Sequence, residues 1–108
     1  MSNVCFNFNK ATLQDSYNPV LEQLAHFLNK NKKLNIQIVG HTDSIGNVQH
    51  NYKLSLERAK TIGKYLIDHG IEKSRITFSG EGSNAPLSSN KDESGRKKNR
   101  RVEFILKK

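Results

Sequence analysis

The fold is decided by residues 36–59, which read IQIVGHTDSIGNVQHNYKLSLERA. The run begins with apolar, mostly β-branched residues and meets Gly40, a pattern typical of a short strand. A polar loop, His41–Gln49, comes next. Apolar residues then return at helical spacing, which predicts a long helix that Gly70 ends. One face of this helix holds Leu54, Ala59, Ile62, Leu66 and His69, and His69 is expected to be an ordinary surface or flank residue.

Three further strands are predicted outside this stretch. Apolar and polar residues alternate over Val4–Phe8, near Arg75–Ser79 and over residues 102–106. Residues 80–99 lie between the last two of these strands and are rich in glycine, serine, asparagine and charge, so they indicate one long loop. Strands with one apolar and one polar face favour a sheet that helices cover on a single side.

A first helix is expected between the first two strands. Asn18 followed by Pro19 is typical of an N-cap with proline at the first helical position. Apolar residues continue at helical spacing as far as Leu28, and the polar run Asn29–Lys33 ends the helix. The resulting order is strand, helix, strand, helix, strand, loop, strand. It favours a two-layer α/β sandwich over a doubly wound sheet.

Length, charge and cysteine content limit what the chain can be. Its 108 residues suffice for one domain, residues 1–108, and the start almost directly on a strand suggests a domain cut from a longer protein. Eighteen lysines and arginines against ten acidic residues give a net charge of +8, which implies an anionic partner. A signal peptide and a membrane-spanning run are not recognisable. The single cysteine, Cys5, excludes an internal disulfide.

Asp43 and Arg58 are the residues most suited to bind a ligand. Asp43 follows the predicted strand, and Arg58 lies in the first turns of the helix beyond the same loop. A carboxylate beside a guanidinium suits a zwitterion such as an amino acid, because the aspartate pairs with the ammonium and the arginine binds the carboxylate through two parallel hydrogen bonds. The alternatives are a turn cap at Asp43, a solvated Arg58, or a salt bridge between them without a ligand.

The basic residues of 96–101 offer a different function. Residues 91–108 hold eight basic and three acidic side chains, so about +5 of the net charge gathers there. Such a cluster fits a basic nucleic-acid-binding domain, although aromatic residues for base stacking are missing until Phe104. A solvated turn before an edge strand is the simpler explanation. A metal hydrolase ranks third, because the histidines form no H-E-x-x-H motif or Cys/His framework.

Several motifs occur in an order that resembles a known family. Residues 40–46 read G-H-T-D-S-I-G, and residues 51–59 read N-Y-K-L-S-L-E-R-A. Further along, G-E-G stands at 80–82 and N-R-R-V-E at 99–103. Together they resemble the G-H-T-D-x-x-G and N-x-x-L-S-x-x-R-A elements of the OmpA-like (OmpA/MotB) C-terminal domain. The resemblance extends from about Phe6 to Ile105.

The resemblance implies an α+β fold: a β-α-β-α-β-β sandwich with a mixed four-stranded sheet and helices packed on one face. It also implies a module without catalytic residues, metal or cofactor. Its expected partner is peptidoglycan, bound through the diaminopimelate of the stem peptide, and nucleic acid is not expected. The module would work in the periplasm as part of an outer-membrane or other envelope-anchored protein. Contact with a membrane would come only through an anchor outside this chain, and a homodimer is compatible with the family.

Roles for individual residues follow from the same resemblance. Asp43 would pair with the ammonium at the free end of diaminopimelate, and Arg58 would bind the carboxylate there. The helper positions implied by the family are Asn9, Thr42, Asn51 and Arg100. Many members carry Asp where this chain has Asn7, so a role that needs a charge at this position does not carry over.

Overall fold

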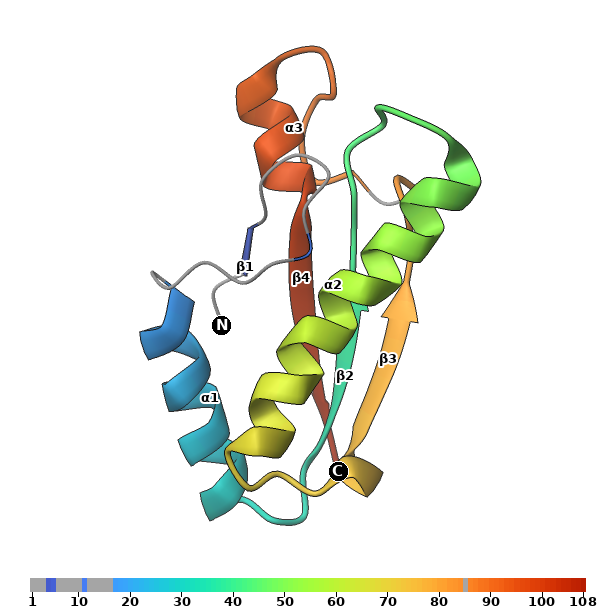
Figure 1. The fold of residues 1–108 in the computed structure, drawn as a ribbon. Coiled ribbons are helices and arrows are strands. Elements are labelled where there is room, and N and C mark those ends of the chain that lie inside the picture. Colours follow the sequence, from blue (N-terminus) through green and yellow to red (C-terminus); the bar gives the residue numbers. More distant parts are fainter. Residues whose placement is uncertain (1–3, 6–10, 12–16, 85) are drawn as a thin grey trace.

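The computed structural model describes residues 4–5, 11, 17–84 and 86–108 (Figure 1). In chain order the elements are β1 (Val4–Cys5), α1 (Asn18–Lys30), β2 (Asn35–Gly40), α2 (Val48–Asp68), a short 3₁₀ turn (Lys73–Arg75), β3 (Ile76–Gly80), α3 (Glu93–Asn99) and β4 (Arg101–Lys107). The predicted strand at Val4–Phe8 is described only over its part in β1, and its remainder lies outside the described residues.

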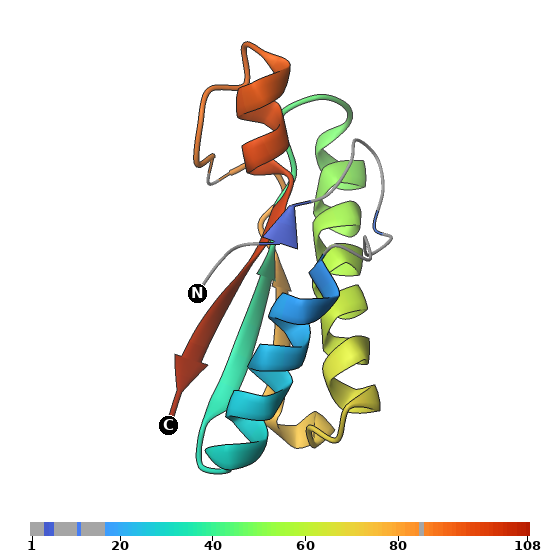
Figure 2. The same cartoon turned by 90° about the vertical axis from the view of Figure 1, so that its left-hand side faces the viewer.

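The sheet is mixed, with the strand order β1-β4-β2-β3. β2 and β3 run parallel, with Ile36 opposite Ile76, while β4 pairs antiparallel with β2. β1 adds a two-residue edge to β4. Both α1 and α2 pack on the same face of this sheet, as Figure 2 shows in side view. The predicted mixed α+β architecture is thus confirmed, with β2, β3 and β4 forming most of the sheet.

The hydrophobic core fills the layer between this face and the two long helices. In β2, Ile36 and Ile38 alternate toward the helices, as the period of two in a strand requires. The helices supply apolar residues three and four positions apart. The core members are Leu21, Leu24, Ala25, Leu28, Ile36, Ile38, Ala59, Ile62, Leu66, Ile71, Ile76 and Val102. In the part of the chain that is described, no helix is long and apolar enough to cross a membrane.

One helix is missing from the sequence-based prediction. The segment 80–99 was expected to be a single loop, yet its last part forms α3. Asp92 caps this helix, and its carboxylate accepts a hydrogen bond of 2.7 Å from the backbone N–H of Gly95. The high content of charge and glycine concealed the helix, because the α3 sequence has no apolar stripe.

The ends of the two long helices differ slightly from the prediction. Tyr17, rather than Asn18, is the N-cap of α1, so Pro19 occupies the second helical position, one later than predicted. α2 ends before Gly70, whose φ of 94° confirms it as the residue that stops the helix. His69 does not point into the core: it is exposed, and its ring stacks on that of Tyr65 with centroids 4.0 Å apart. His69 is thus a surface residue, as expected, although its spacing matches that of the apolar face.

β2 approaches α2 very closely at Gly40. A Cβ atom added there would lie 1.8 Å from the backbone oxygen of Ser55, a separation that no real contact allows. The absence of a side chain at Gly40 therefore lets the strand end directly against the helix. This contact brings the residues after β2 beside the first turns of α2.

We expect Gly40→Ala to lower the free energy of unfolding by about 3 kcal/mol, since backbone must move to admit the methyl group. Urea denaturation measures this change. Thr77→Ala, an exposed substitution on the neighbouring β3, is the control and should cost less than about 1 kcal/mol. Equal losses in the two variants would show that the close contact at Gly40 does not limit stability.

Candidate functional site

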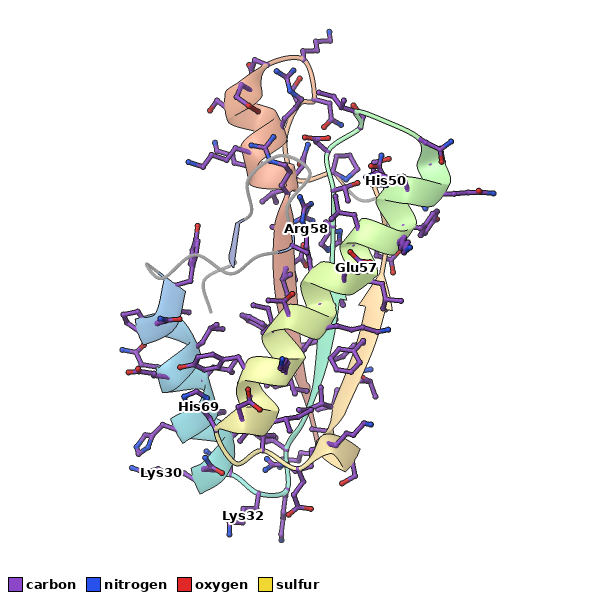
Figure 3. The ribbon with its side chains drawn as sticks, in the orientation of Figure 1. Lys30, Lys32, His50, Glu57, Arg58 and His69 are labelled. Atoms are coloured by element: carbon purple, nitrogen blue, oxygen red, sulfur yellow. The ribbon has the colours of Figure 1, made fainter. Side chains whose placement is uncertain are left out.

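A small cavity lies where β2 leads into the loop before α2, beneath the junction of α3 and β4. Its volume is about 190 Å³. Figure 3 labels two of the lining residues, Arg58 and His50, both carried by α2. The full lining is Thr42, Asp43, Ile45, Gly46, His50, Asn51, Leu54, Arg58 and Arg100. Asp43 and Arg58, the two residues singled out in the sequence, therefore share one cavity.

Backbone hydrogen bonds beyond the end of β2 fix the position of Asp43. The N–H of His41 donates to the carbonyl of Arg101, and the N–H of Thr42 donates to the carbonyl of Gly82, each at 2.8 Å. The chain is thus held from both sides after the strand ends. Asp43 is only 2% exposed, and Thr42 is also buried, with its hydroxyl donating to the Asp43 carbonyl at 2.9 Å.

Among the described residues, the carboxylate of Asp43 has two hydrogen-bond partners. Oδ1 accepts a hydrogen bond of 3.1 Å from the N–H of Ile45, which closes a local turn. Oδ2 accepts a charge-assisted hydrogen bond of 3.0 Å from Nη1 of Arg100. Asp43 therefore does cap a turn, one of the alternatives considered from the sequence. It also presents its charge to the cavity.

Arg58 is the largest of the fully buried side chains described in the structure. Its Nη1 donates a hydrogen bond of 2.9 Å to the carbonyl of His41, the residue two positions before Asp43. Burial, together with the positive charge of Arg100, lowers the pKa of Arg58 to about 10, and Asp43 opposes this change only in part. The surroundings thus disfavour the charged guanidinium, and an anion entering the cavity would stabilise it.

Arg100 ties α3 and β4 to the same site. Its Nη1 lies 3.0 Å from Oδ2 of Asp43 and 2.9 Å from Oε1 of Glu93. Burial alone would lower the pKa of Arg100, but hydrogen bonds to Glu93 and Asp43 outweigh it and raise the pKa. The hydrogen bond to Glu93 favours the charged form of the acid as well, and it lowers the pKa of Glu93. Arg100 is therefore a fixed cation that holds the Asp43 carboxylate in place.

The remaining predicted residues fall into two groups. Asn51 is buried and lines the cavity, as Thr42 does, whereas Asn9 lies outside the described residues. Four lining residues were not predicted: Ile45, Gly46, His50 and Leu54. Helical spacing contained a usable signal for two of them, because residues four apart on α2, at 50, 54 and 58, share one face.

A second ionic cluster, formed by His41, Arg101 and Glu103, adjoins the site. The ring of His41 is 4% exposed, and its Nε2 lies 3.3 Å from Oε1 of Glu103. Arg101 binds the same carboxylate oxygen through its Nε at 2.7 Å. Burial, followed by the charge of Arg101, lowers the pKa of His41, while Glu103 and Glu81 oppose the change. Since its carbonyl accepts the hydrogen bond from Arg58, His41 links this cluster to the cavity.

The lining of the cavity suits an ionic ligand. It combines one carboxylate with two guanidinium groups, and amide and hydroxyl groups stand beside them. In the described parts of the chain, no group of three or more His, Cys, Asp or Glu side chains is placed to hold a metal ion. A molecule that carries both an ammonium and a carboxylate matches this arrangement of charges.

Comparison with known proteins gives consistent results. The model of the OmpA family matches residues 5–100. Outer membrane protein A of Bordetella avium is 42% identical over 101 residues, which cover 94% of this chain and 52% of that protein. Outer membrane porin F of Pseudomonas fluorescens is 39% identical over 93% of this chain and 31% of its own length. The chain thus spans about half or less of these relatives.

Two solved structures superimpose closely on the fold. The peptidoglycan-associated lipoprotein from Burkholderia pseudomallei has a TM-score of 0.96 at 27% identity, covering 99% of this chain and 91% of that one. The C-terminal domain of Helicobacter pylori MotB has a TM-score of 0.92 at 27% identity, covering 100% of this chain and 85% of the other. Both similarities extend over the cavity as well as the sheet and long helices.

Removal of the two opposite charges should affect stability unequally. Asp43→Ala leaves the positive charges of Arg58 and Arg100 without the carboxylate between them, and we expect it to lower the free energy of unfolding by about 3 kcal/mol. Arg58→Met removes a cation disfavoured by burial, and Asp43 keeps Arg100, so only the lost hydrogen bond to the His41 carbonyl should lower the free energy of unfolding, by about 1–2 kcal/mol. Urea unfolding at neutral pH compares the two. A larger loss in Arg58→Met would contradict this electrostatic account.

Stability should also fall at mildly acidic pH because of His41. Its pKa is 6.5 in the unfolded chain and lower in the folded one, so the unfolded chain binds the extra proton between these values. The free energy of unfolding should therefore decrease as pH drops below 6.5 and stop responding to His41 below the folded pKa. Unfolding measured at about pH 7 and about pH 5.5 tests this, with His41→Gln as the comparison. Equal pH dependence in both proteins would argue against it.

Proposed function

Because this chain belongs to the OmpA family, we propose that it is a non-catalytic module that binds peptidoglycan. Support comes from the similar structure whose name describes a peptidoglycan-associated lipoprotein. The curated relatives are outer membrane proteins of which the chain spans about half or less, so the module would belong to a larger envelope protein. Its place would be the periplasm, where it would hold that protein to the cell wall without making or cutting a bond.

The ligand we propose is the free end of diaminopimelate in the stem peptide. There, one carbon carries an ammonium and a carboxylate. The observation that carries this proposal is that Asp43 and Arg58 line a single buried cavity. Asp43 would accept hydrogen bonds from the ammonium, and Arg58 would donate to the carboxylate. Thr42, Asn51, Arg100 and Asn9 would complete the polar contacts.

The charges of the cavity favour both halves of such a ligand. A bound carboxylate would stabilise Arg58, whose charged form burial disfavours. The carboxylate of Asp43 can accept about four hydrogen bonds and uses its oxygens for Ile45 and Arg100, so capacity remains for an ammonium. The ligand would thus add one positive and one negative charge, each beside a group of opposite sign.

The size of the cavity limits how much of the polymer enters. Sites for drug-sized molecules measure roughly 300–1,000 Å³, whereas this cavity measures about 190 Å³. It therefore fits the end of one amino-acid side chain, while the sugar backbone stays outside. A single site of this kind would bind modestly, and the many stem peptides of the wall would strengthen attachment through avidity.

Nucleic-acid binding by the basic residues of 96–101 is less favoured. Arg100 and Arg101 are buried and engage Asp43, Glu93 and Glu103 within the protein. A phosphate backbone binds arginines that are accessible at the surface. Two of the five basic side chains of 96–101 are therefore neutralised within the protein.

Binding to a short stem peptide that ends in diaminopimelate tests the proposal by calorimetry. We expect Asp43→Asn to weaken binding at least about thirtyfold, because a buried ammonium would lose its counter-charge. Asparagine keeps the size of the side chain and an oxygen for Ile45. The control is Glu57→Gln, which changes the net charge equally on the exposed side of α2 (Figure 3) and should bind like wild type.

The same peptide with lysine in place of diaminopimelate tests the role of Arg58. It lacks the carboxylate and should bind about 1–3 kcal/mol more weakly to wild type. Arg58→Met should lose this discrimination and bind both peptides equally poorly. If Asp43→Asn and Arg58→Met bind the diaminopimelate peptide as wild type does, the proposed site is wrong.

A further inference from the structure

A basic groove lies at the end of the molecule remote from the cavity of Asp43. We call it the lysine groove; it measures about 630 Å³. Its lining is Asn29, Lys30, Asn31, Lys32, Lys33, Leu34 and Lys108. Figure 3 shows Lys30 and Lys32 near the lower end, where α1 leads into β2, and Arg58 and His50 in the other half. Four of the seven side chains are thus lysines, and none of the seven is acidic.

The turn that carries these lysines is firmly held. Arg75 reaches it from the 3₁₀ turn before β3, and its Nε donates to the carbonyl of Leu34 at 2.9 Å. Its Nη2 donates to the carbonyls of Leu28 and Asn31 at 2.9 and 3.0 Å. The guanidinium is therefore used for backbone contacts. The groove is shaped by these bonds, although its like charges repel one another.

The lysines of the groove differ from the arginines near the cavity. Among the ion pairs found in the described residues, none involves Lys30, Lys32, Lys33 or Lys108. All four are exposed. Arg100 and Arg101, in contrast, are buried against carboxylates. The groove therefore presents four exposed ammonium groups to an outside partner.

We propose that the lysine groove docks on a membrane surface rich in anionic phospholipid headgroups. Several phosphates side by side provide the opposite charge that four neighbouring lysines lack within the protein. Lysine is suited to such a surface, because its long stem lets the ammonium adjust to headgroups without fixed positions. The groove therefore binds an array of lipid phosphates rather than one ordered anion.

Two exposed apolar side chains near the same end favour a membrane, rather than a nucleic acid, as the partner of the groove. Phe27 in the last turns of α1 is 41% exposed, and Ile67 in the last turn of α2 is 38% exposed. Both helices end on the side of the groove (Figure 1). Apolar side chains beside lysines are typical of surfaces that enter the headgroup region. The groove itself has no aromatic residue on which a base could stack.

The membrane contact and the cavity are far enough apart to act separately. α2 has 21 residues and reaches from the cavity toward the other end, a length of about 31 Å at 1.5 Å per residue. The molecule extends 41 Å along its longest axis. A membrane at the lysine groove therefore leaves the cavity open. This inference does not depend on the proposed binding of peptidoglycan.

Flotation with lipid vesicles tests the inference. Wild type should bind vesicles of phosphatidylcholine that contain about one third phosphatidylglycerol, and not vesicles of phosphatidylcholine alone. The triple variant Lys30→Gln, Lys32→Gln, Lys33→Gln should bind about a hundredfold more weakly, since each lysine near an anionic surface contributes roughly fivefold. The matched control changes three exposed lysines on α2 to glutamine: Lys53, Lys60 and Lys64.

The control has the same net charge as the groove variant and should lose less than about fivefold in affinity. Failure of wild type to bind anionic vesicles, or equal losses in both variants, would overturn the inference. Binding to a single-stranded oligonucleotide that exceeds vesicle binding and disappears in the groove variant would assign the groove to nucleic acid instead. Asp43→Asn should retain vesicle binding, and the groove variant should retain the stem peptide, so the two proposals fail separately.

Discussion

The hydrogen bond from buried Arg58 to the carbonyl of His41 is the contact on which the site depends. It joins α2 to the residue that directly follows β2, and Gly40 makes the approach possible because it has no side chain. An arginine placed there lines the same cavity as Asp43, and its guanidinium is removed from contact with solvent. The fold therefore buries the charged guanidinium of Arg58 at an electrostatic cost, and the carboxylate of a ligand can offset this cost.

Sequence alone predicted β2, β3 and β4, the two long helices and the placement of Asp43 and Arg58 on either side of one loop. Both residues flank one loop between a strand and a helix, so local periodicity places them together. Arg100 is different, because 57 positions separate it from Asp43 along the chain. Only the family resemblance indicated it. Helical spacing could have added His50 and Leu54, which share the face of Arg58.

The parts that the sequence did not predict depend on tertiary contacts or on caps. α3 has too few apolar residues for a periodic pattern, and Asp92 and Arg100 hold it through polar bonds. The N-cap of α1 is Tyr17, although the sequence pattern favoured Asn18. Such positions are decided by where an element starts or stops. Hydrophobic patterns define that boundary least well.

The division of basic residues between the two ends follows from the chemistry of their side chains. Arginine can be buried with carboxylates because its planar guanidinium forms several hydrogen bonds in fixed directions. Arg58, Arg100 and Arg101 accordingly lie inside, where they shape the cavity. Lysine keeps a strongly hydrated charge and stays at the surface. The charge of 96–101 therefore reaches the surface in part, through Lys97 and Lys98, and the lysine groove presents a second basic surface at the opposite end.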